Sequence, residues 1–415
     1  MAQASVARPA SAPSASSLIG LDSLNFFIAG MQAAFGPYVA VYLADKKWTQ
    51  EDIGFVLSAG SFAALLSQLP GGELVDTVRS KRALIALGVF MMAVSALIIA
   101  FWPTWPMVLI ALVMQGMTGG IIGVAVAAIS LGLVGLSKLP ERLGRNQRFA
   151  SIGGLIVAGL MGVIANYLQY QAIFATVAIL SLPAFAVLLQ IRSADVHFGR
   201  SCGAAEHETL SQSERADRSL LWKRPGLVVF AAILFLFQLA NASILPLAGA
   251  DLVYQDVQHT SLIVSALIVV PQLVVALTAP EVGRYATIWG RRPLLLIGLA
   301  SLPIRAFLFA LDPYPLLLIA VQLLDGVSGA ILGVLTAQII ADITDGSGRF
   351  NLAQGFVGTS SGIGAAISIS LFGLVATHFG HTTAFLGIAA VALLAFLLAM
   401  LLMPETKPPP EAINA

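Results

Sequence analysis

Residues 106–136 read PMVLIALVMQGMTGGIIGVAVAAISLGLVGL, a stretch without a single charged side chain. A transmembrane helix needs about 20 consecutive apolar residues to cross the hydrocarbon core of a bilayer, and this stretch is long enough. In lipid the backbone must satisfy its own hydrogen bonds, which a helix does. The apolar residues also lack the strict alternation of barrel strands. The stretch therefore predicts a membrane-spanning helix.

The composition of the whole chain favours the same interpretation. Of 415 residues, 58% are hydrophobic and 10% are charged, and the mean hydropathy is +0.89. A soluble domain carries about 25% charged residues, so most of the outer surface must face lipid. Apolar runs of spanning length fall at 18–43, 53–74, 83–103, 106–136, 149–168 and 171–191, and again at 225–250, 261–281, 293–311, 314–341, 353–377 and 382–403.

These twelve runs form two groups of six, which predicts an all-α integral membrane protein built from two six-helix bundles. The first residues are rich in Ala, Ser and Pro, a composition typical of disorder. The segment between the groups is polar and contains the single cysteine, Cys202, which we expect in solvent. The predicted domains are a disordered cytoplasmic N-terminus (1–17), an N-terminal bundle (18–191), a cytoplasmic linker (192–224), a C-terminal bundle (225–403) and a cytoplasmic tail (404–415).

The basic residues indicate how the chain crosses the membrane. Cytoplasmic loops of membrane proteins carry an excess of Lys and Arg. If the N-terminus is cytoplasmic, nearly all basic residues lie on the cytoplasmic side of the membrane. The exceptions are Lys46 and Lys47, which lie on the opposite side, and Arg305, which lies within a span. We therefore expect a multi-pass protein of the bacterial inner membrane with both termini in the cytoplasm.

Several classes of function are excluded or disfavoured. The formal net charge of +1 gives no basic footprint for nucleic acid. One cysteine and five scattered histidines offer no disulfide and no metal-ligand spacing. The chain has no GxxxxGK[ST] loop, so nothing indicates that ATP drives it. An enzyme is disfavoured because no nucleophile–base set lies at membrane depth. We expect no cofactor and no metal.

The two groups of spans repeat each other. Residues 115–123 (QGMTGGIIG) match residues 325–333 (DGVSGAILG), and the loop that begins at Gly72 matches the loop that begins at Gly283 at nearly the same separation. The matches indicate a duplicated six-helix unit. Because six is an even number, the two copies have the same orientation in the membrane, which is a parallel repeat.

Two loops carry a family resemblance. Residues 72–82 (GELVDTVRSKR) and 283–292 (GRYATIWGRR) resemble the signature G-x-L-x-D-x-x-G-R-[KR] of major facilitator transporters. With the twelve spans, the repeat and the linker, the resemblance covers the whole chain. The alternative explanation of the two basic loops is the general excess of positive charge on the cytoplasmic side of membrane proteins. It implies alternating access of two bundles around one central site. It also implies a conformational latch formed by Gly72, Asp76, Arg79, Lys81, Arg82, Gly283, Gly290, Arg291 and Arg292.

In this latch, as the resemblance implies it, basic residues and a neighbouring helix N-terminus hold the Asp76 carboxylate and close one face of the protein. Two residues depart from the family pattern. Position 79 is Arg where the family usually has Gly, and Thr287 replaces the acid in the second copy. We therefore expect a latch in the first half, whereas the second half lacks its carboxylate.

Two further family motifs are altered. Leu112 stands where many proton-coupled members have an arginine in the fourth span, so their coupling scheme is not carried over. The antiporter motif in the fifth span normally includes a Gly-Pro pair, but this chain has Gly153-Gly154, then Gly159 and Gly162, without a proline. The export signature is degraded, and we interpret these small residues as sites of close helix packing.

An acid and a base lie near mid-membrane in adjacent spans. A charge at that depth costs about 2.5–3.5 kcal/mol on insertion scales. Asp325 lies in the tenth span and Arg305 in the ninth, and the short turn between these spans makes them antiparallel neighbours. One interpretation is a structural ion pair, and the other is a substrate or proton site.

Polar side chains also gather in the first, fourth, seventh and tenth spans, which line the central cavity in the family. Each amide could instead form a hydrogen bond between helices without touching substrate. An acid near the start of a helix is favoured by the helix dipole in any case. The candidates for substrate or coupling contacts are Asp22, Asn25, Gln32, Gln115, Gln238, Asn241 and Gln322, together with Arg305 and Asp325.

The expected function is secondary active transport by alternating access. Because the spans carry little charge, we favour proton-coupled efflux, by antiport, of a small drug-like or metabolite compound. The alternative is a proton-coupled uptake symporter for a metabolite, for example an organic acid held by Arg305. A membrane sensor or scaffold is a third class, but it would need an added soluble domain. A monomer in the lipid bilayer is expected, with a small-molecule substrate and protons as its partners.

Overall fold

The computed structural model describes residues 13–33, 35, 37–48, 50–167, 171–203, 224–248, 260–311 and 314–407. Within these ranges nearly every residue is helical, and none belongs to a β-strand. Ten of the described helices are long and apolar enough to cross a membrane. The predicted all-α integral membrane fold is confirmed.

One of these ten helices, α5, contains two of the predicted spans. It includes Gly135, whose φ of 71° is a conformation that favours glycine, and the chain bends there between the fourth and fifth spans. The first predicted span corresponds to two shorter helices in succession, α1 and α2. The helices of the first half are α1 (Ala15–Ala33), α2 (Pro37–Asp45), α3 (Gln50–Thr77), α4 (Lys81–Phe101), α5 (Trp105–Tyr167) and α6 (Gln171–Gln190).

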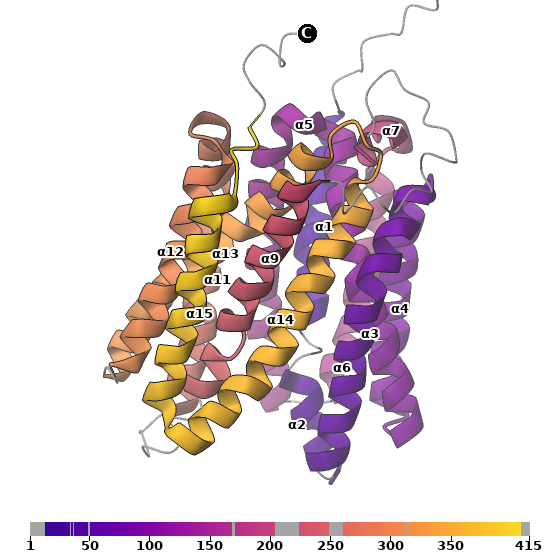
Figure 1. Cartoon of the computed structure of the whole chain (residues 1–415). Helices are drawn as coiled ribbons and strands as arrows, with labels where there is room; N and C mark the ends of the chain where they lie inside the picture. Colours follow the sequence, from indigo (N-terminus) through magenta and orange to yellow (C-terminus); the bar gives the residue numbers. More distant parts are fainter. Residues whose placement is uncertain are drawn as a thin grey trace, which may run out of the picture.

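The second half forms a second bundle beside the first, and Figure 1 shows its orange and yellow helices next to the indigo and magenta helices of the first half. Two short elements of the linker, η1 (Ser193–Asp195) and α7 (Phe198–Ser201), lie between them in the chain. The helices of the second half are α9 (Pro225–Asn241), α11 (Thr260–Ile288), α12 (Arg291–Ala310), α13 (Pro315–Thr344), α14 (Phe350–Phe379) and α15 (His381–Leu402).

Each bundle has a hydrophobic core of its own. One core draws its buried side chains only from residues 21–191. The other is built mainly from residues 227–403 and adds four side chains of α5, namely Ala127, Leu131, Leu139 and Leu143. Because the cores are largely separate, the two bundles can move relative to each other without either core being taken apart.

The start of the chain is more ordered than its composition indicates. Residues 1–12 lie outside the described residues, but residues 15–17, which we expected to be disordered, form the first turn of α1. The Asp195 carboxylate of the linker accepts hydrogen bonds from the Ser14 backbone N–H at 3.1 Å and the Ser17 hydroxyl at 2.7 Å. Hydrogen bonds from the Ser14 and Ser17 hydroxyls lower the pKa of Asp195. The linker therefore caps α1, so the helix starts earlier than predicted.

Glycines in the fifth span allow close packing, although not all of them do so. A Cβ at Gly153 would collide with the backbone carbonyl of Phe26 in α1, whereas a Cβ at Gly154 or Gly159 would meet nothing. The packing interpretation therefore applies to Gly153, where the α1 and α5 backbones touch.

This difference gives a matched pair of variants. An alanine in place of a helical glycine ordinarily favours folding by up to ~1 kcal/mol. We expect Gly154→Ala to leave the melting temperature unchanged or raise it. Gly153→Ala should lower it, because overpacking against backbone costs about 1–3 kcal/mol. Intrinsic tryptophan fluorescence of the detergent-purified protein during heating measures both. Equal melting temperatures for the two variants would contradict the observed approach of α1 to α5.

Candidate functional site

Two connected cavities lie between the bundles. One has a volume of about 390 Å³ and is lined by α3, α5, α9, α13 and α14. The other has a volume of about 430 Å³ and is lined by α1, α5, α13 and α14. Both are lined by Gly123, Leu332, Thr336 and Gln354. Cavities of this size suit a small organic molecule, so the space between the two halves is the candidate binding site.

The lining of the two cavities is polar but uncharged. Among the residues that the structure describes, no lining side chain of either cavity is charged. Aliphatic residues and glycines form most of the walls. The polar contributions are seven amides and two hydroxyls, from Asn25, Gln32, Gln68, Asn146, Gln147, Gln238, Gln354, Thr336 and Ser361.

The sequence-based candidates divide between the cavities and the protein interior. Asn25, Gln32 and Gln238 line the cavities. Gln115 lines neither of them. Gln322 is buried, and its side-chain N–H donates to the Leu267 carbonyl at 2.9 Å. Gln322 thus forms a hydrogen bond between α11 and α13, as the alternative interpretation expected.

Four cavity amides were not among the sequence candidates, namely Gln68, Asn146, Gln147 and Gln354. Gln68 lies in α3, Asn146 and Gln147 in the second part of α5, and Gln354 in α14. The resemblance directed attention to the first, fourth, seventh and tenth spans, and these four residues lie outside all of them. The sequence did contain a signal for Gln68 and Gln354, because each is an amide within a predicted apolar span.

The predicted pairing of Arg305 with Asp325 is present. An Arg305 N–H donates to the Asp325 carboxylate, and a second donates to the Asn241 side-chain oxygen at 3.0 Å. Three helices, α9, α12 and α13, are thereby joined. The Arg305 side chain is 2% exposed and the Asp325 side chain 29%. The carboxylate is therefore the more accessible member, and neither lines the two described cavities.

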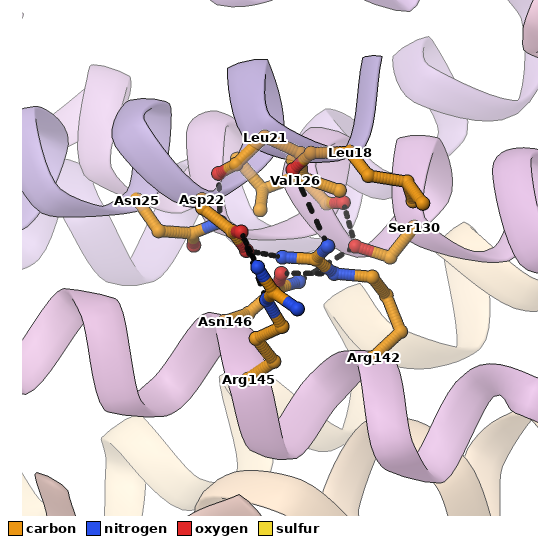
Figure 2. A network of polar contacts seen from close by, with 9 residues as sticks. All are labelled: Leu18, Leu21, Asp22, Asn25, Val126, Ser130, Arg142, Arg145 and Asn146. Carbon is orange, nitrogen blue, oxygen red and sulfur yellow. Dashed lines mark hydrogen bonds and ion pairs between the residues drawn. The ribbon is translucent and has the colours of Figure 1, made fainter. Parts of the chain in front are cut away.

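Asp22 is held by two arginines of α5 (Figure 2). One oxygen of its carboxylate contacts Arg142, and the other accepts from the Arg145 Nε at 2.8 Å. The Arg142 Nε donates to the Asn146 side chain at 2.8 Å, which in turn donates to the Ser130 hydroxyl at 2.7 Å. Asp22 is 2% exposed. It belongs to a network of ion pairs and hydrogen bonds in which Asn146 is the member that lines a cavity.

Asp76 joins the two bundles near the linker. Its carboxylate accepts hydrogen bonds from the Asn351 side chain at 2.8 Å and from the Asn351 and Leu352 backbone N–H groups at 3.3 Å and 2.8 Å. These N–H groups belong to the first turn of α14, which is the positive end of the helix dipole. A Cβ at Gly72 would collide with the Asn351 carbonyl, so glycine permits the approach. This is the geometry that the latch hypothesis expects.

The linker takes part in this contact, which corrects our expectation for Cys202. The residue is 5% exposed rather than in solvent. Its thiol donates to the Asp76 carbonyl at 3.3 Å, and its own carbonyl accepts from the Phe350 N–H at 3.1 Å. The Ser201 carbonyl accepts from the Asn351 side chain at 3.0 Å. The linker folds back because its carbonyls satisfy donors at the start of α14. Burial raises the pKa of the Cys202 thiol.

Lys81 and Arg291 are the first residues of the helices that follow the duplicated loops, α4 and α12, and they make corresponding contacts. Lys81 is buried and donates to the carbonyls of Val75 and Val78, at the end of α3. Arg291 donates to the Ala286 carbonyl at 3.0 Å, near the end of α11. A cation at a helix C-terminus is favoured by the helix dipole. The duplicated loops thus keep their cationic cap in both halves.

The second copy nevertheless lacks an inter-bundle carboxylate, as predicted. The Thr287 hydroxyl donates to the Arg284 carbonyl of its own helix at 2.6 Å. Glu405 of the tail accepts from the backbone N–H groups of Arg291 and Arg292 at 2.9 Å and 3.1 Å, within the second bundle. Arg291 also forms an ion pair with Asp342 at 2.8 Å. These charges stabilise one bundle and do not link the two.

The remaining latch candidates have simpler surroundings. A Cβ at Gly283 would collide with the Pro140 carbonyl, so α11 and α5 approach each other as α3 and α14 do. Gly290 precedes α12 with a φ of 98°, a conformation that favours glycine. Arg82 donates to the Ser193 hydroxyl at 2.7 Å. Arg79, which replaces the family glycine, is exposed.

Comparisons with known proteins agree with this architecture. The chain matches the Major Facilitator Superfamily over residues 21–248 and again over 230–415. The proton:xylose symporter XylE, solved with 6-bromo-6-deoxy-D-glucose bound, has a similar fold with a TM-score of 0.73 and 15% identity, covering 94% of this chain and 97% of that one.

Two curated relatives are closer in sequence. An uncharacterised MFS-type transporter of Mycobacterium tuberculosis strain H37Rv is 35% identical over 389 residues, which is 93% of each chain. The class B tetracycline resistance protein of Escherichia coli is 32% identical over 129 residues, which is 31% of each chain. The duplicated family match, the 35% identity over nearly the full length and the fold show that this chain is a transporter of the Major Facilitator Superfamily.

Proposed function

We propose that the protein is a proton-coupled exporter of a small organic compound. The observation that carries the proposal is the uncharged lining of the two cavities between the bundles. We interpret the buried Asp76 contact, which joins α3 to α14, as the closed end of this space. A strongly anionic or phosphorylated substrate would need a counter-charge there, because an unpaired buried ion is costly. The partial similarity to a tetracycline resistance protein supports export of such a compound.

The closed end fits one stage of an export cycle. If both termini are cytoplasmic, as the basic residues indicate, the Asp76 contact and the linker seal the cavity from the cytoplasm. An exporter releases its substrate in this state and reopens toward the cytoplasm once the contact breaks. Asp76 thus favours one of two states without touching the substrate.

The uptake alternative has less support. An organic acid held by Arg305 would need that guanidinium to face the substrate. Arg305 is instead buried against Asp325 and Asn241 and lines neither described cavity. An Arg305 already paired with a carboxylate cannot bind a second one without breaking the pair.

Transport by membrane vesicles tests the direction. In everted vesicles with an acidic interior, an antiporter should accumulate its substrate, and a protonophore should abolish the accumulation. Tetracycline is the first probe, followed by a panel of neutral drugs, with vesicles from cells lacking the protein as the control. Accumulation in right-side-out vesicles under an inward proton gradient would instead establish the uptake symporter.

We predict that Asp325 carries the coupling proton. Arg305 holds its carboxylate ionised in the present state, and separation of the pair would free the carboxylate to take a proton. Asp325→Asn should abolish accumulation driven by a pH gradient in proteoliposomes yet spare substrate exchange, which needs no net proton movement. If the variant still accumulates substrate at a near wild-type rate, the pair is structural and coupling must be sought at Asp22.

We predict that Asp76→Asn slows transport and leaves substrate affinity within a few-fold of wild type. The asparagine keeps one acceptor but loses the charge at the α14 N-terminus, which weakens the closed state by about 1–2 kcal/mol. Proteoliposome flux and equilibrium binding measure the two quantities separately. Loss of binding with unchanged accessibility of the two faces would disprove the latch role.

The labelling rate of Cys202 should report on the equilibrium between the closed state held by Asp76 and the open state. Cys202 is the protein's single cysteine, so the label is specific. In the closed state its thiol is buried and its pKa is raised, so little reactive thiolate is present at neutral pH. We expect slow labelling by a maleimide in wild type and roughly five-fold or faster labelling in Asp76→Asn, as 1 kcal/mol of destabilisation implies. Equal labelling rates would show that the linker does not follow the latch.

A further inference from the structure

Two cavity amides of the first bundle reach across to glycines of the second. A Cβ at Gly358 in α14 would collide with the Gln68 side-chain oxygen, and a Cβ at Gly333 in α13 would lie 2.9 Å from the Gln147 amide carbon. Each glutamine therefore occupies the space that a side chain on the facing helix would fill. This arrangement holds both amides at the boundary of the two bundles, where a ligand contacts both halves.

A third amide, Gln354, lies between them. It lines both cavities, whereas Gln68 lines only the first and Gln147 only the second. It also lies in α14, one turn after Asn351, which binds the Asp76 carboxylate. A ligand on Gln354 would therefore contact the same helix that closes the latch.

Two of these amides have unmet hydrogen-bonding capacity. The buried side-chain oxygen of Gln68 and the buried side-chain nitrogen of Gln354 have no hydrogen-bond partner among the residues that the structure describes. A buried polar atom left unpaired costs about 1–3 kcal/mol. A terminal amide offers an acceptor and a donor whichever way it is turned. The pair therefore calls for a ligand group that both donates and accepts.

Other cavity amides are already committed to the protein. Asn146 accepts from Arg142 and donates to Ser130, so its side-chain oxygen and nitrogen are both already hydrogen-bonded (Figure 2). The Asn25 side-chain N–H donates to the Leu21 carbonyl of its own helix at 2.7 Å. Asp22 forms ion pairs with both Arg142 and Arg145, and Asn146 is the member of this network that lines a cavity. None of the three charged side chains lines the two described cavities.

We infer that Gln68, Gln147 and Gln354 determine specificity, and that the cavity takes an uncharged solute carrying a hydroxyl or carboxamide group. Such groups donate and accept at once, as the unpaired atoms of Gln68 and Gln354 require. An ionised solute would lose its hydration and find no counter-charge. The inference rests on the proposed transport function but assigns the substrate class and its contacts, which that function leaves open.

Ligand binding to the purified full-length protein tests the solute class. Thermal shift is measured with a library of neutral hydroxyl or carboxamide compounds, each paired with a charged analogue, including nicotinamide with nicotinate and D-glucose with D-glucuronate and D-glucosamine. We expect the stabilising compounds to be neutral members of their pairs. Preferential stabilisation by charged members, or no stabilisation by any neutral member, would overturn the inference.

Variants then test the residues, using the best neutral binder. Gln68→Leu, Gln147→Leu and Gln354→Leu should each weaken binding about ten-fold, whereas Gln115→Leu, an amide outside the cavities, should not. Gly358→Ala should weaken binding by displacing Gln68 without removing it, with Gly154→Ala as the control. Gln354→Glu should allow an ammonium analogue of the neutral binder, such as D-glucosamine for D-glucose, to bind in the cavity. A purely structural residue would not change the preference in this way.

The outcomes separate this inference from the proposed function. Unchanged affinity in all three glutamine variants would overturn the inference, even if export is observed. A neutral compound that binds through these glutamines but accumulates only in right-side-out vesicles would support the inference and contradict the direction of transport.

Discussion

The Asp76 carboxylate at the N-terminus of α14 is the interaction on which the arrangement of the two halves depends. It accepts three hydrogen bonds from the other bundle, and the nearby Gly72 lets the backbones touch. A buried carboxylate in apolar surroundings is costly unless such donors meet it. The contact therefore stabilises the arrangement in which the start of α14 lies against the end of α3.

The linker strengthens this interpretation. Cys202 and Ser201 add their carbonyls to the same helix start, so three separate parts of the chain meet there. A polar segment that looked like a simple connection is partly a component of the closed end. Under the proposed latch, opening would require the linker to release the donors of α14 together with Asp76, which would make opening cooperative.

Several charged side chains elsewhere in the bundles are paired. Asp22 pairs with Arg142 and Arg145, and Arg305 pairs with Asp325. Paired charges cost far less in a low-dielectric interior than single ones. No charged side chain lines the two described cavities, which offer hydrogen bonds alone, and this lining is the basis of the proposed substrate class.

The sequence by itself determined the membrane class, the duplicated bundles and the missing acid at Thr287, and it placed Arg305 and Asp325 in adjacent antiparallel spans. Apolar run length, repeat spacing and charge position are local properties, and lipid leaves a helix as the simplest way to satisfy the backbone. Only the tertiary structure decided that Cys202 is buried, that Gln322 bonds within the protein, and that Gln68, Gln147 and Gln354 face a common space. Whether a polar side chain meets a cavity or a neighbouring backbone depends on how distant helices are turned toward each other, and no single span encodes that rotation.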